Sequence, residues 1–413
     1  MTLPVARIVP ADRPAPAAAR AGRPLLTVVV PTYNERENVG WLVTRIDHAL
    51  AGIDAEIIFV DDSDDDTPFV VQRITSRHPI TLIHRDSPHR AGGLGTAIAM
   101  GLERATGEYV CVLDGDLQHP PEKLTELLAA AQHSRADVVV ASRYSPGGSA
   151  GGLTSRARKL ISIASKWLSR VLFYEKLRAT SDPGSGFFLI RREVVEDVEL
   201  RPIGYKMLTE VLMRGRWSTI VEIPYCFQNR VAGSSKATLR QGVQYLQHTL
   251  RLFCEVPDAA RLWKFLIVGA SGVVVNLGLL WMVSVQAGLP RWAGWTTGVE
   301  SSIVTNFLLN RSFTWGDRAA SGLAMLPQAA RYHLTCLAAV ATNLAVFTTT
   351  SLFLGAPVML AGLMAIGAGL TANFLGASTW VFQRPSRAPA RVLPSALPQA
   401  VEVAADLEEL RAA

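Results

Sequence analysis

The first 255 residues alternate between two patterns of hydrophobic and polar positions. Short runs of apolar, often β-branched residues are separated by stretches whose apolar residues recur at helical spacing. We expect buried parallel strands at residues 25–34, 55–63, 80–86, 108–116 and 137–144. Helical patterns begin between them, near Glu35, Asp66, Gly92 and Pro120. This alternation predicts a doubly wound α/β sheet.

Polar side chains gather where these runs end. Ligands of such sheets bind beyond the carboxyl ends of the strands. The residues at these ends are Tyr33, Asn34, Glu35, Asp61, Asp62, Asp114, Asp116 and Arg143. One acidic strand end is explained by a helix cap, but four polar ends on one rim indicate a binding site. No dinucleotide or P-loop glycine motif occurs, which disfavours those two kinds of site. The glycines of residues 91–101 suit either a phosphate site or helix packing.

Asp114 and Asp116 flank a single glycine at the end of the fourth run. They suit a capped turn, an acid/base pair or a site for a hard divalent cation. Glycoside hydrolysis requires carboxyl groups about 5–9 Å apart across a sugar, whereas residues that flank one glycine converge on one point. Gln118 adds a neutral oxygen. Together with the other acidic strand ends, this spacing favours Mg²⁺ or Mn²⁺.

The pattern changes after residue 261. Between residues 262 and 382 the only acidic residues are Glu300 and Asp317. Four apolar segments are long enough to cross a membrane, namely residues 262–286, 293–313, 332–354 and 357–381. Basic residues precede the first, separate the second from the third and follow the fourth. The positive-inside rule therefore places both ends and the preceding α/β domain on the cytoplasmic side.

The four apolar segments repeat at one offset. Asn276 and Asn343 are 67 positions apart, as are Asn306 and Asn373, and no gap is needed. The offset predicts duplication of a two-helix unit, with both copies inserted in the same orientation. We expect the paired asparagines to hydrogen-bond between helices. Glu300, a rare residue within a span, predicts a partner or a functional role.

Two basic segments carry an apolar helical stripe. Residues 153–174 place Leu160, Ala164, Trp167, Leu168, Val171 and Leu172 on one face. Residues 238–253 do the same with Leu239, Val243, Leu246, Leu250 and Phe253. The stripe of such a helix either packs on the domain core or lies in a membrane interface. Because the second segment runs directly into the apolar half, we favour the interface.

Composition narrows the class further. The net charge of +6 is modest and basic residues lie near the apolar segments, which indicates anionic lipid rather than nucleic acid as a partner. The four cysteines lack metal-ligand spacing, and we expect reduced, buried thiols. We expect disorder at residues 1–23 and 384–413 and no signal peptide. The domains expected between them are residues 24–236, an interfacial linker at 237–260 and a membrane domain at 261–383.

Several motifs together resemble the family 2 glycosyltransferases of GT-A fold, most closely the polyprenyl-phosphate (dolichol-phosphate) mannose synthases. They are "VVVPTYNERENV", "FVDDSDDDT", "LDGDLQHPPE", "ASRY" and "SDPGSGFFLIRREVV", in that order. The apolar half resembles the GtrA-like four-helix membrane domain. The resemblance implies a GT-A (Rossmann-like) catalytic domain followed by an all-α membrane domain.

The resemblance also implies roles for residues. It implies that a metal binds Asp114, Asp116 and Gln118, and that the nucleotide sugar contacts Pro31, Tyr33, Glu35, Asp61, Asp114, Asp116, Arg230 and Lys236. Phosphate of the acceptor is implied to meet Arg143, Ser185, Ser234 and Ser235. Asp116, Arg143 and Asp182 are implied to be catalytic. In two departures, Arg90 stands near the family's lysine, and Gly115 replaces the alanine of Asp-Ala-Asp.

The implied reaction is an inverting transfer of mannose from GDP-mannose to dolichol or polyprenyl phosphate by a membrane-bound enzyme. The lipid monophosphate is anionic near neutral pH, so it needs alignment rather than a strong base. Two alternatives stay open at this point: a polyprenyl-phosphate glucosyltransferase that uses UDP-glucose, and a flippase of lipid-linked sugars.

Overall fold

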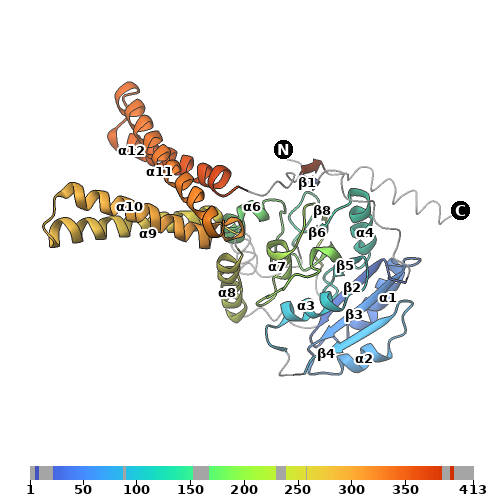
Figure 1. The fold of residues 1–413 in the computed structure, drawn as a ribbon. Coiled ribbons are helices and arrows are strands. Elements are labelled where there is room, and N and C mark those ends of the chain that lie inside the picture. The colour runs from blue at the N-terminus through green and yellow to red at the C-terminus, as the bar shows by residue number, and fades with distance from the viewer. Residues whose placement is uncertain are drawn as a thin grey trace. The chain divides into compact units, whose positions relative to one another are not determined.

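The computed structural model describes residues 5–8, 22–86, 90–151, 167–228, 239–256, 258–383 and 391–394. The chain divides into two compact units (Figure 1). Unit 1 comprises residues 1–252 and 388–413, and unit 2 comprises residues 253–387. Each unit is described by itself below.

Unit 1 is built on a sheet of seven strands in the order β4-β3-β2-β5-β7-β6-β8. The strands are β2 (Leu26–Thr32), β3 (Ala55–Asp61), β4 (Ile80–His84), β5 (Tyr109–Val112), β6 (Val138–Ser142), β7 (Phe188–Arg191) and β8 (Ile220–Pro224). All five strands predicted from the apolar runs are confirmed. β7 corrects the all-parallel prediction, because it enters between β5 and β6 and runs antiparallel to both.

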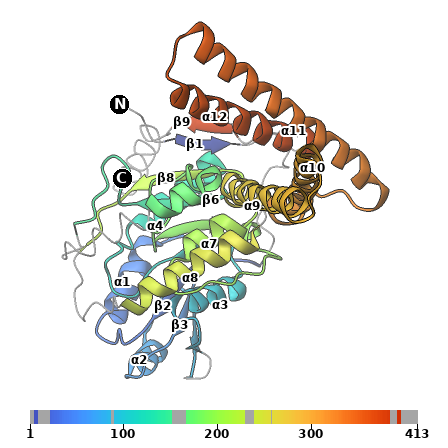
Figure 2. The same ribbon diagram turned by 90° about the vertical axis from the view of Figure 1, so that its left-hand side faces the viewer.

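Helices cover both faces of this sheet, as expected for an α/β fold (Figure 2). One face packs on α1 (Val39–Ala49), α2 (Thr67–Arg73) and α4 (Lys123–Ser134) in one continuous hydrophobic core. α3 (Leu94–Arg104) covers the other face of β2 and β3. Its approach is close, since a Cβ on Gly101 would lie 2.3 Å from Cγ1 of Val29. By packing on the sheet, these helices fix the positions of the strand ends, which the polar residues follow.

Helix α8 (Leu239–Glu255) carries the second predicted apolar stripe. The burial of its residues shows which way this stripe faces. His248 and Leu252 are buried, and Nε2 of His248 lies 2.8 Å from Oε2 of Glu210 on α7 (Met207–Arg214). Val243, Leu246 and Leu250 are each more than half exposed. The polar side thus anchors α8 to unit 1 and the apolar stripe points outward, contrary to the alternative in which the stripe packs on the core. Of the other predicted stripe, the structure describes only residues 167–174, where Trp167 is exposed.

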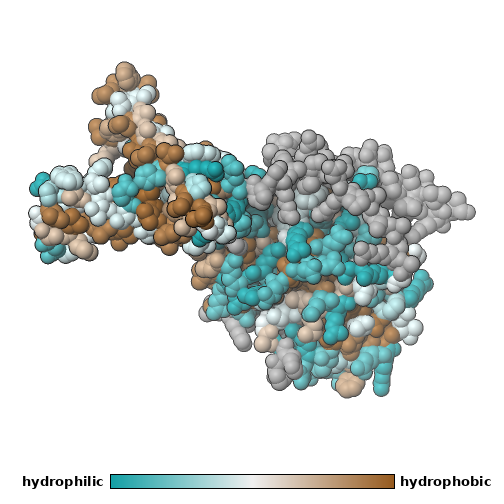
Figure 3. Space-filling model, viewed as in Figure 1, coloured by the Kyte–Doolittle hydropathy of each residue, from teal (hydrophilic) through white to brown (hydrophobic). Residues whose placement is uncertain are grey.

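Unit 2 contains four long helices in its described part. They are α9 (Arg261–Trp281), α10 (Arg291–Leu309), α11 (Met325–Thr348) and α12 (Val358–Gly376). α9 pairs with α10 and α11 with α12. Three stretches are long and apolar enough to cross a membrane: Arg261–Gln286, Gly322–Phe353 and Val358–Val381. We predicted four such spans, and three of them are found. The remaining predicted span forms helix α10, which is less apolar. Figure 3 shows hydrophobic residues over much of the visible surface of these helices.

The two helix pairs share their backbone irregularities. Each pair's helices end in wider π-type turns, Met282–Gln286 and Asn310–Thr314 in the first, Thr349–Phe353 and Ala377–Val381 in the second. Corresponding turns start 67 positions apart, the offset of the sequence repeat. Gly288 and Gly355, at the same offset, both adopt positive φ between the helices of a pair. The predicted duplication of a two-helix unit is thus visible in the backbone.

The repeated asparagines lie where the paired helices meet. A Cβ on Gly272 of α9 would lie 2.4 Å from Nδ2 of Asn306, and one on Gly298 of α10 would lie 2.5 Å from Oδ1 of Asn276. Asn373 accepts a long hydrogen bond, 3.9 Å, from Sγ of Cys336. Small residues therefore admit the asparagines into the helix contacts.

Glu300 of α10 has a neighbour on α11. Its Oε2 lies 3.8 Å from Nδ1 of His333, and both side chains are partly exposed. The structure thus supplies the partner expected for an acidic residue in this region.

We expect Gly272→Val to separate α9 from α10. The added side chain would collide with Asn306, and overpacking of this kind costs about 1–3 kcal/mol. Gly269→Val is the matched control, because a Cβ there has nothing within 4 Å. Thermal unfolding of the full chain in detergent should show a lower Tm for Gly272→Val than for Gly269→Val. Equal values would contradict this account of the helix contact.

The cysteines and termini complete the comparison with the predictions. All four cysteines are free thiols, but Cys226 and Cys254 are exposed rather than buried, since both lie at element ends on the surface. β1 (Val5–Ile8) and β9 (Arg391–Pro394) pair antiparallel within segments where we expected disorder. Apart from residues 22 and 23, the rest of those segments lies outside the described residues.

Candidate active site

The carboxyl ends of β2, β3, β5 and β6 lie on one edge of the sheet, because these strands run in the same direction. The polar residues predicted to form a rim follow these ends. The tertiary structure therefore brings together side chains that are up to about a hundred positions apart in the sequence.

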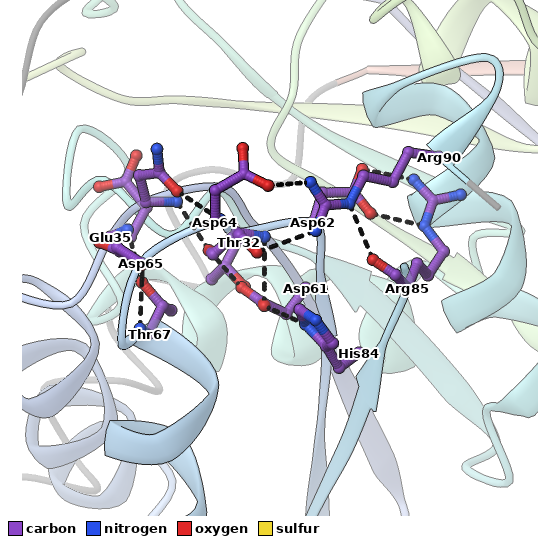
Figure 4. Close-up of polar contacts among 12 residues, drawn as sticks. Thr32, Glu35, Asp61, Asp62, Asp64, Asp65, Thr67, His84, Arg85 and Arg90 are labelled. Carbon is purple, nitrogen blue, oxygen red and sulfur yellow. Dashed lines mark hydrogen bonds and ion pairs between the residues drawn. The ribbon is translucent and has the colours of Figure 1, made fainter. Parts of the chain in front are cut away.

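The end of β3 is a closed network of hydrogen bonds (Figure 4). Asp61 is fully buried and accepts hydrogen bonds from Oγ1 of Thr32 at 2.7 Å and Oγ of Ser63 at 2.6 Å. Its other oxygen lies 2.7 Å from Nδ1 of His84. Both carboxylate oxygens of Asp61 are thus engaged inside the protein, where they fix the β2 and β3 ends relative to β4.

Two arginines, of which the motifs pointed only to Arg90, neutralise the acids that follow β3 (Figure 4). Arg85 is buried and binds both oxygens of Asp62 at 2.7 and 2.6 Å. It also donates to the carbonyl of Gly93 at 3.2 Å, which ties the strand end to the glycine-rich turn before α3. Arg90 pairs with Asp64, which also accepts a hydrogen bond from the half-exposed Tyr33 at 3.3 Å. Sequence reasoning missed Arg85, whose neighbours gave no motif.

The turn between the two aspartates presses against the end of β2. A Cβ on Gly115 would lie 2.9 Å from Cγ2 of Thr32 and 3.3 Å from the carbonyl oxygen of Pro31. The chain then reverses through Leu117, which has a φ of +61°. Both features keep Asp114 and Asp116 in one tight turn, with Glu35 adjacent.

We expect Gly115→Ala to lower stability by about 1–3 kcal/mol, because the methyl group overpacks against Thr32. Thr32→Ser removes Cγ2 but keeps the hydroxyl that binds Asp61, so the double variant should recover most of the loss. Chemical denaturation of the full chain in detergent measures both effects. A double variant no more stable than Gly115→Ala alone would refute the proposed contact.

The aspartate pair has the chemistry of an incomplete site for a hard cation. Asp116 is buried and its Oδ1 accepts a hydrogen bond from the backbone N–H of Gln118 at 3.1 Å, while Asp114 is partly exposed. Gln118 donates its amide N–H to the carbonyl of Gln228 at 3.0 Å, so its amide oxygen is the atom suited to a cation. Within the described residues, no cluster of three or more His, Cys, Asp or Glu side chains could hold a metal. Two carboxylates and one amide fit Mg²⁺ or Mn²⁺, which complete their coordination with water and phosphate.

Two features near Asp114 escaped the sequence analysis. Gly186 lies close to the aspartate pair, since a Cβ on it would lie 3.0 Å from Oδ2 of Asp114, a tighter contact than a Cβ ordinarily makes. His119 is buried against the rings of Phe187 and Tyr225, and its Nδ1 lies 3.7 Å from Oδ2 of Asp114. Burial lowers the pKa of His119 to about 4, so the imidazole beside the aspartate is neutral.

Arg143, at the end of β6, forms a buried ion pair with Asp182. Nε and Nη2 of Arg143 lie 2.7 and 2.8 Å from the two oxygens of Asp182. Burial acts to raise the pKa of Asp182, but the Arg143 hydrogen bonds outweigh it and hold this pKa below its usual value. Among the residues that the structure describes, none accepts a hydrogen bond from Nη1 of Arg143. The pair thus orients a guanidinium with one nitrogen available to a ligand.

The remaining predicted residues divide into two groups. Ser185 donates its hydroxyl to the carbonyl of Ala141 at 2.7 Å and therefore braces the loop that carries Asp182. Pro31 lies within β2, and the backbone N–H of Glu35 donates to Oγ1 of Thr67 at 3.0 Å. Arg230, Ser234, Ser235 and Lys236 lie outside the described residues.

Comparison with known proteins accounts for both units. Residues 27–199 match Glycosyl transferase family 2, and residues 264–382 match the GtrA/DPMS transmembrane domain. The chain is 39% identical to the dolichol-phosphate mannosyltransferase of Pyrococcus furiosus over 343 residues, which cover 83% of this chain and 94% of the relative. It is 32% identical to the Saccharomyces cerevisiae protein of the same name, over 55% of this chain and 86% of that protein.

Solved structures are less similar to this chain. The mannosyl-3-phosphoglycerate synthase of Rubrobacter xylanophilus is 20% identical, with a TM-score of 0.43 over 55% of this chain and 73% of that chain. The match to the Pyrococcus furiosus protein extends over both units. The chain therefore belongs to the dolichol-phosphate mannosyltransferase family and joins a family 2 glycosyltransferase domain to a GtrA/DPMS transmembrane domain.

Proposed function

We propose that this protein transfers mannose from GDP-mannose to the phosphate of dolichol or another polyprenyl phosphate, giving the polyprenyl-phosphate mannose and GDP. The observation that carries the proposal is the 39% identity to a dolichol-phosphate mannosyltransferase, because it extends over 94% of that relative and so includes both units. The clustering of Asp114, Asp116 and Arg143 on one edge of the sheet supports the same activity.

Asp114, Asp116 and Gln118 would hold a divalent cation, Mg²⁺ or Mn²⁺, which when bound neutralises the charge of the donor diphosphate. The protein's own part is to fix these ligands. The turn at Gly115 packs against β2, and the backbone N–H of Gln118 holds Asp116. Tyr33 and Glu35, on the adjacent strand end, would contact the nucleotide together with the β3 end, which Asp61 braces.

Arg143 would bind the acceptor phosphate through Nη1. Asp182 holds the other side of its guanidinium, so the ion pair aligns the phosphate for attack rather than accepting a proton. An acceptor phosphate oxygen forms a bond to C1 of mannose while the bond from C1 to the diphosphate oxygen breaks. The electron pair of that bond leaves with GDP. Attack from the side opposite the leaving group inverts the configuration at C1.

The outward stripe of α8 would lie in the membrane interface. Val243, Leu246 and Leu250 present an exposed apolar surface on a helix whose other side is anchored in unit 1. An interfacial position satisfies such a stripe and brings the domain to the depth of lipid phosphates.

The orientation follows from the repeat. Because α9–α10 matches α11–α12 at one offset, we propose that α10 crosses the membrane as α12 does, despite its lower hydropathy. Four crossings return both ends to one side. Arg261, Arg311, Arg318 and Arg331 then flank the cytoplasmic ends of the helices, as the positive-inside rule requires. In this proposed orientation the catalytic domain would lie in the cytoplasm.

The test is a transfer assay with the purified full chain, Mg²⁺ or Mn²⁺ and polyprenyl phosphate. We expect a mannolipid from GDP-mannose, none from UDP-glucose, and none when polyprenol replaces its phosphate. Product from UDP-glucose alone would replace the proposed donor. Absence of product from every nucleotide sugar, with a folded protein and added metal, would refute the proposed activity.

A further inference from the structure

Lys206 is a buried lysine that the site described so far does not use. It is only 9% exposed, and it precedes α7. Its ammonium lies over the loop that carries Asp182, because a Cβ on Gly184 would fall 2.4 Å from Nζ of Lys206. The absence of a side chain at Gly184 is what leaves room for the ammonium.

The charges around Lys206 do not balance. Asp182 attracts its ammonium and Arg143 repels it. The carboxylate of Asp182, however, is already held through both oxygens by Arg143. In the parts of the chain that the structure describes, no carboxylate lies within ion-pair distance of Lys206, whose Nζ is 5.0 Å from the ring centroid of Tyr205. Two cations therefore share one anion.

A buried cation without its own anion is unfavourable, so a bound anion would stabilise this arrangement. Burial, with a contribution from Arg143, lowers the pKa of Lys206 to about 8. The ammonium is therefore mostly protonated at neutral pH. It carries the charge that a phosphate group would offset.

The loop that holds Lys206 also reaches the aspartate pair. Gly184 faces Nζ of Lys206, and Gly186, two residues later, faces Oδ2 of Asp114, because a Cβ added to either glycine would lie within 3.0 Å of that atom. Two residues of extended chain span at most about 7 Å. The carbonyl of Gly184 also accepts a hydrogen bond from Nη2 of Arg143 at 3.4 Å. One short loop thus has two cations at one end and the proposed metal ligand at the other.

Building on the proposed function, we infer that Lys206 binds the phosphate of the lipid acceptor together with Arg143. The ligand class is a prenyl monophosphate. The donor diphosphate lies at the Asp114 end of the loop, the acceptor phosphate at the Lys206 end, and the transferred sugar between them. Lys206 keeps its proton during the reaction and acts by attraction and alignment alone.

The test compares Lys206→Met with Lys176→Met in the full chain. Methionine keeps most of the aliphatic stem and removes the charge. Lys176 is the matched control, because its ammonium donates to the backbone carbonyl of Met213 at 2.6 Å and it has no place in the proposed site. Calorimetry in detergent measures binding of farnesyl phosphate and of farnesol, and the transfer assay gives a separate KM for donor and acceptor.

We expect Lys206→Met to raise the Kd for farnesyl phosphate and the acceptor KM by about ten- to a hundred-fold, the range for a lost hydrogen bond to a charged group. The Kd for farnesol and the KM for GDP-mannose should stay unchanged. Lys176→Met should match the wild type in both Kd values and both KM values. Gly184→Ala is a second variant that keeps the charge. Its methyl group would displace the ammonium, so it should also raise the acceptor KM.

Unchanged acceptor constants in a folded Lys206→Met variant would overturn the inference, as would a rise confined to the KM for GDP-mannose. If Lys206→Met does not fold, an unchanged acceptor KM in Gly184→Ala overturns it. If the proposed function is wrong, the outcome differs from these results, because the wild type itself would make no mannolipid. Loss of farnesyl phosphate binding in Lys206→Met would still support a phosphate site at Lys206.

Discussion

Asp116→Asn is expected to lower mannolipid formation by at least about a hundred-fold while leaving the fold intact. The substitution removes one of two carboxylates that would hold the divalent cation. It preserves size and leaves an amide oxygen to accept the hydrogen bond from the backbone N–H of Gln118. The measurement is the initial rate of transfer from GDP-mannose at a metal concentration that saturates the wild type, with thermal unfolding to verify the fold.

Asp54→Asn is the control for Asp116→Asn. Asp54 is exposed and precedes β3, at the opposite edge of the sheet from the aspartate pair. Its substitution removes the same charge and should leave the rate unchanged. Near-normal transfer by Asp116→Asn would rule out a metal-binding role for this carboxylate, and a higher concentration of metal should recover part of the activity if the role is right.

Asp182→Asn is expected to cost about 3–5 kcal/mol of stability and to abolish transfer, because it leaves the buried guanidinium of Arg143 without its anion. Arg143→Met should have a similar cost for the reciprocal reason. The double variant should be less destabilised than the sum of the two, because no uncompensated buried charge remains. Denaturant unfolding of the four proteins measures this coupling, and strict additivity would show that the pair does not act as a unit.

The pH dependence of stability gives an independent test of the same ion pair. The pKa of Asp182 is lower in the folded protein than its ordinary value. The stability that Asp182 contributes is therefore fully present above about pH 4 and is lost as the pH falls through the lowered pKa. The wild type should lose stability in this acid range more steeply than the Arg143→Met, Asp182→Asn double variant. Parallel curves would contradict the assigned pairing.

The sequence alone was sufficient where the determining interactions are local or periodic. The five apolar runs became β2 to β6 because strands covered by helices on both faces need apolar residues at nearly every position, and β2, β3, β5 and β6 are buried along almost their whole length. The 67-residue offset predicted that unit 2 repeats its local structure, and the π-type turns Met282–Gln286 and Thr349–Phe353 correspond. They correspond because each copy of a duplicated segment folds through the same local contacts. The rim was predictable because strand direction in an α/β sheet fixes which ends meet.

Only the tertiary structure decided which charges meet. Nothing near Asp182 in the sequence shows that Arg143, 39 positions away, holds both its oxygens. The resemblance implied that Asp61 contacts the nucleotide, and only the folded chain shows that Thr32, Ser63 and His84 engage its carboxylate.

β7 shows the same limit in the backbone. It enters between β5 and β6 from a later part of the chain and runs antiparallel to both. Strand order, ion pairing and the burial of Lys206 depend on contacts between segments distant in sequence, and their free energies are set by the assembled interior. The sequence by itself thus determined β2 to β6, the rim and the resemblance to the family, and the folded chain decided the place of β7 and the partners of each charged group.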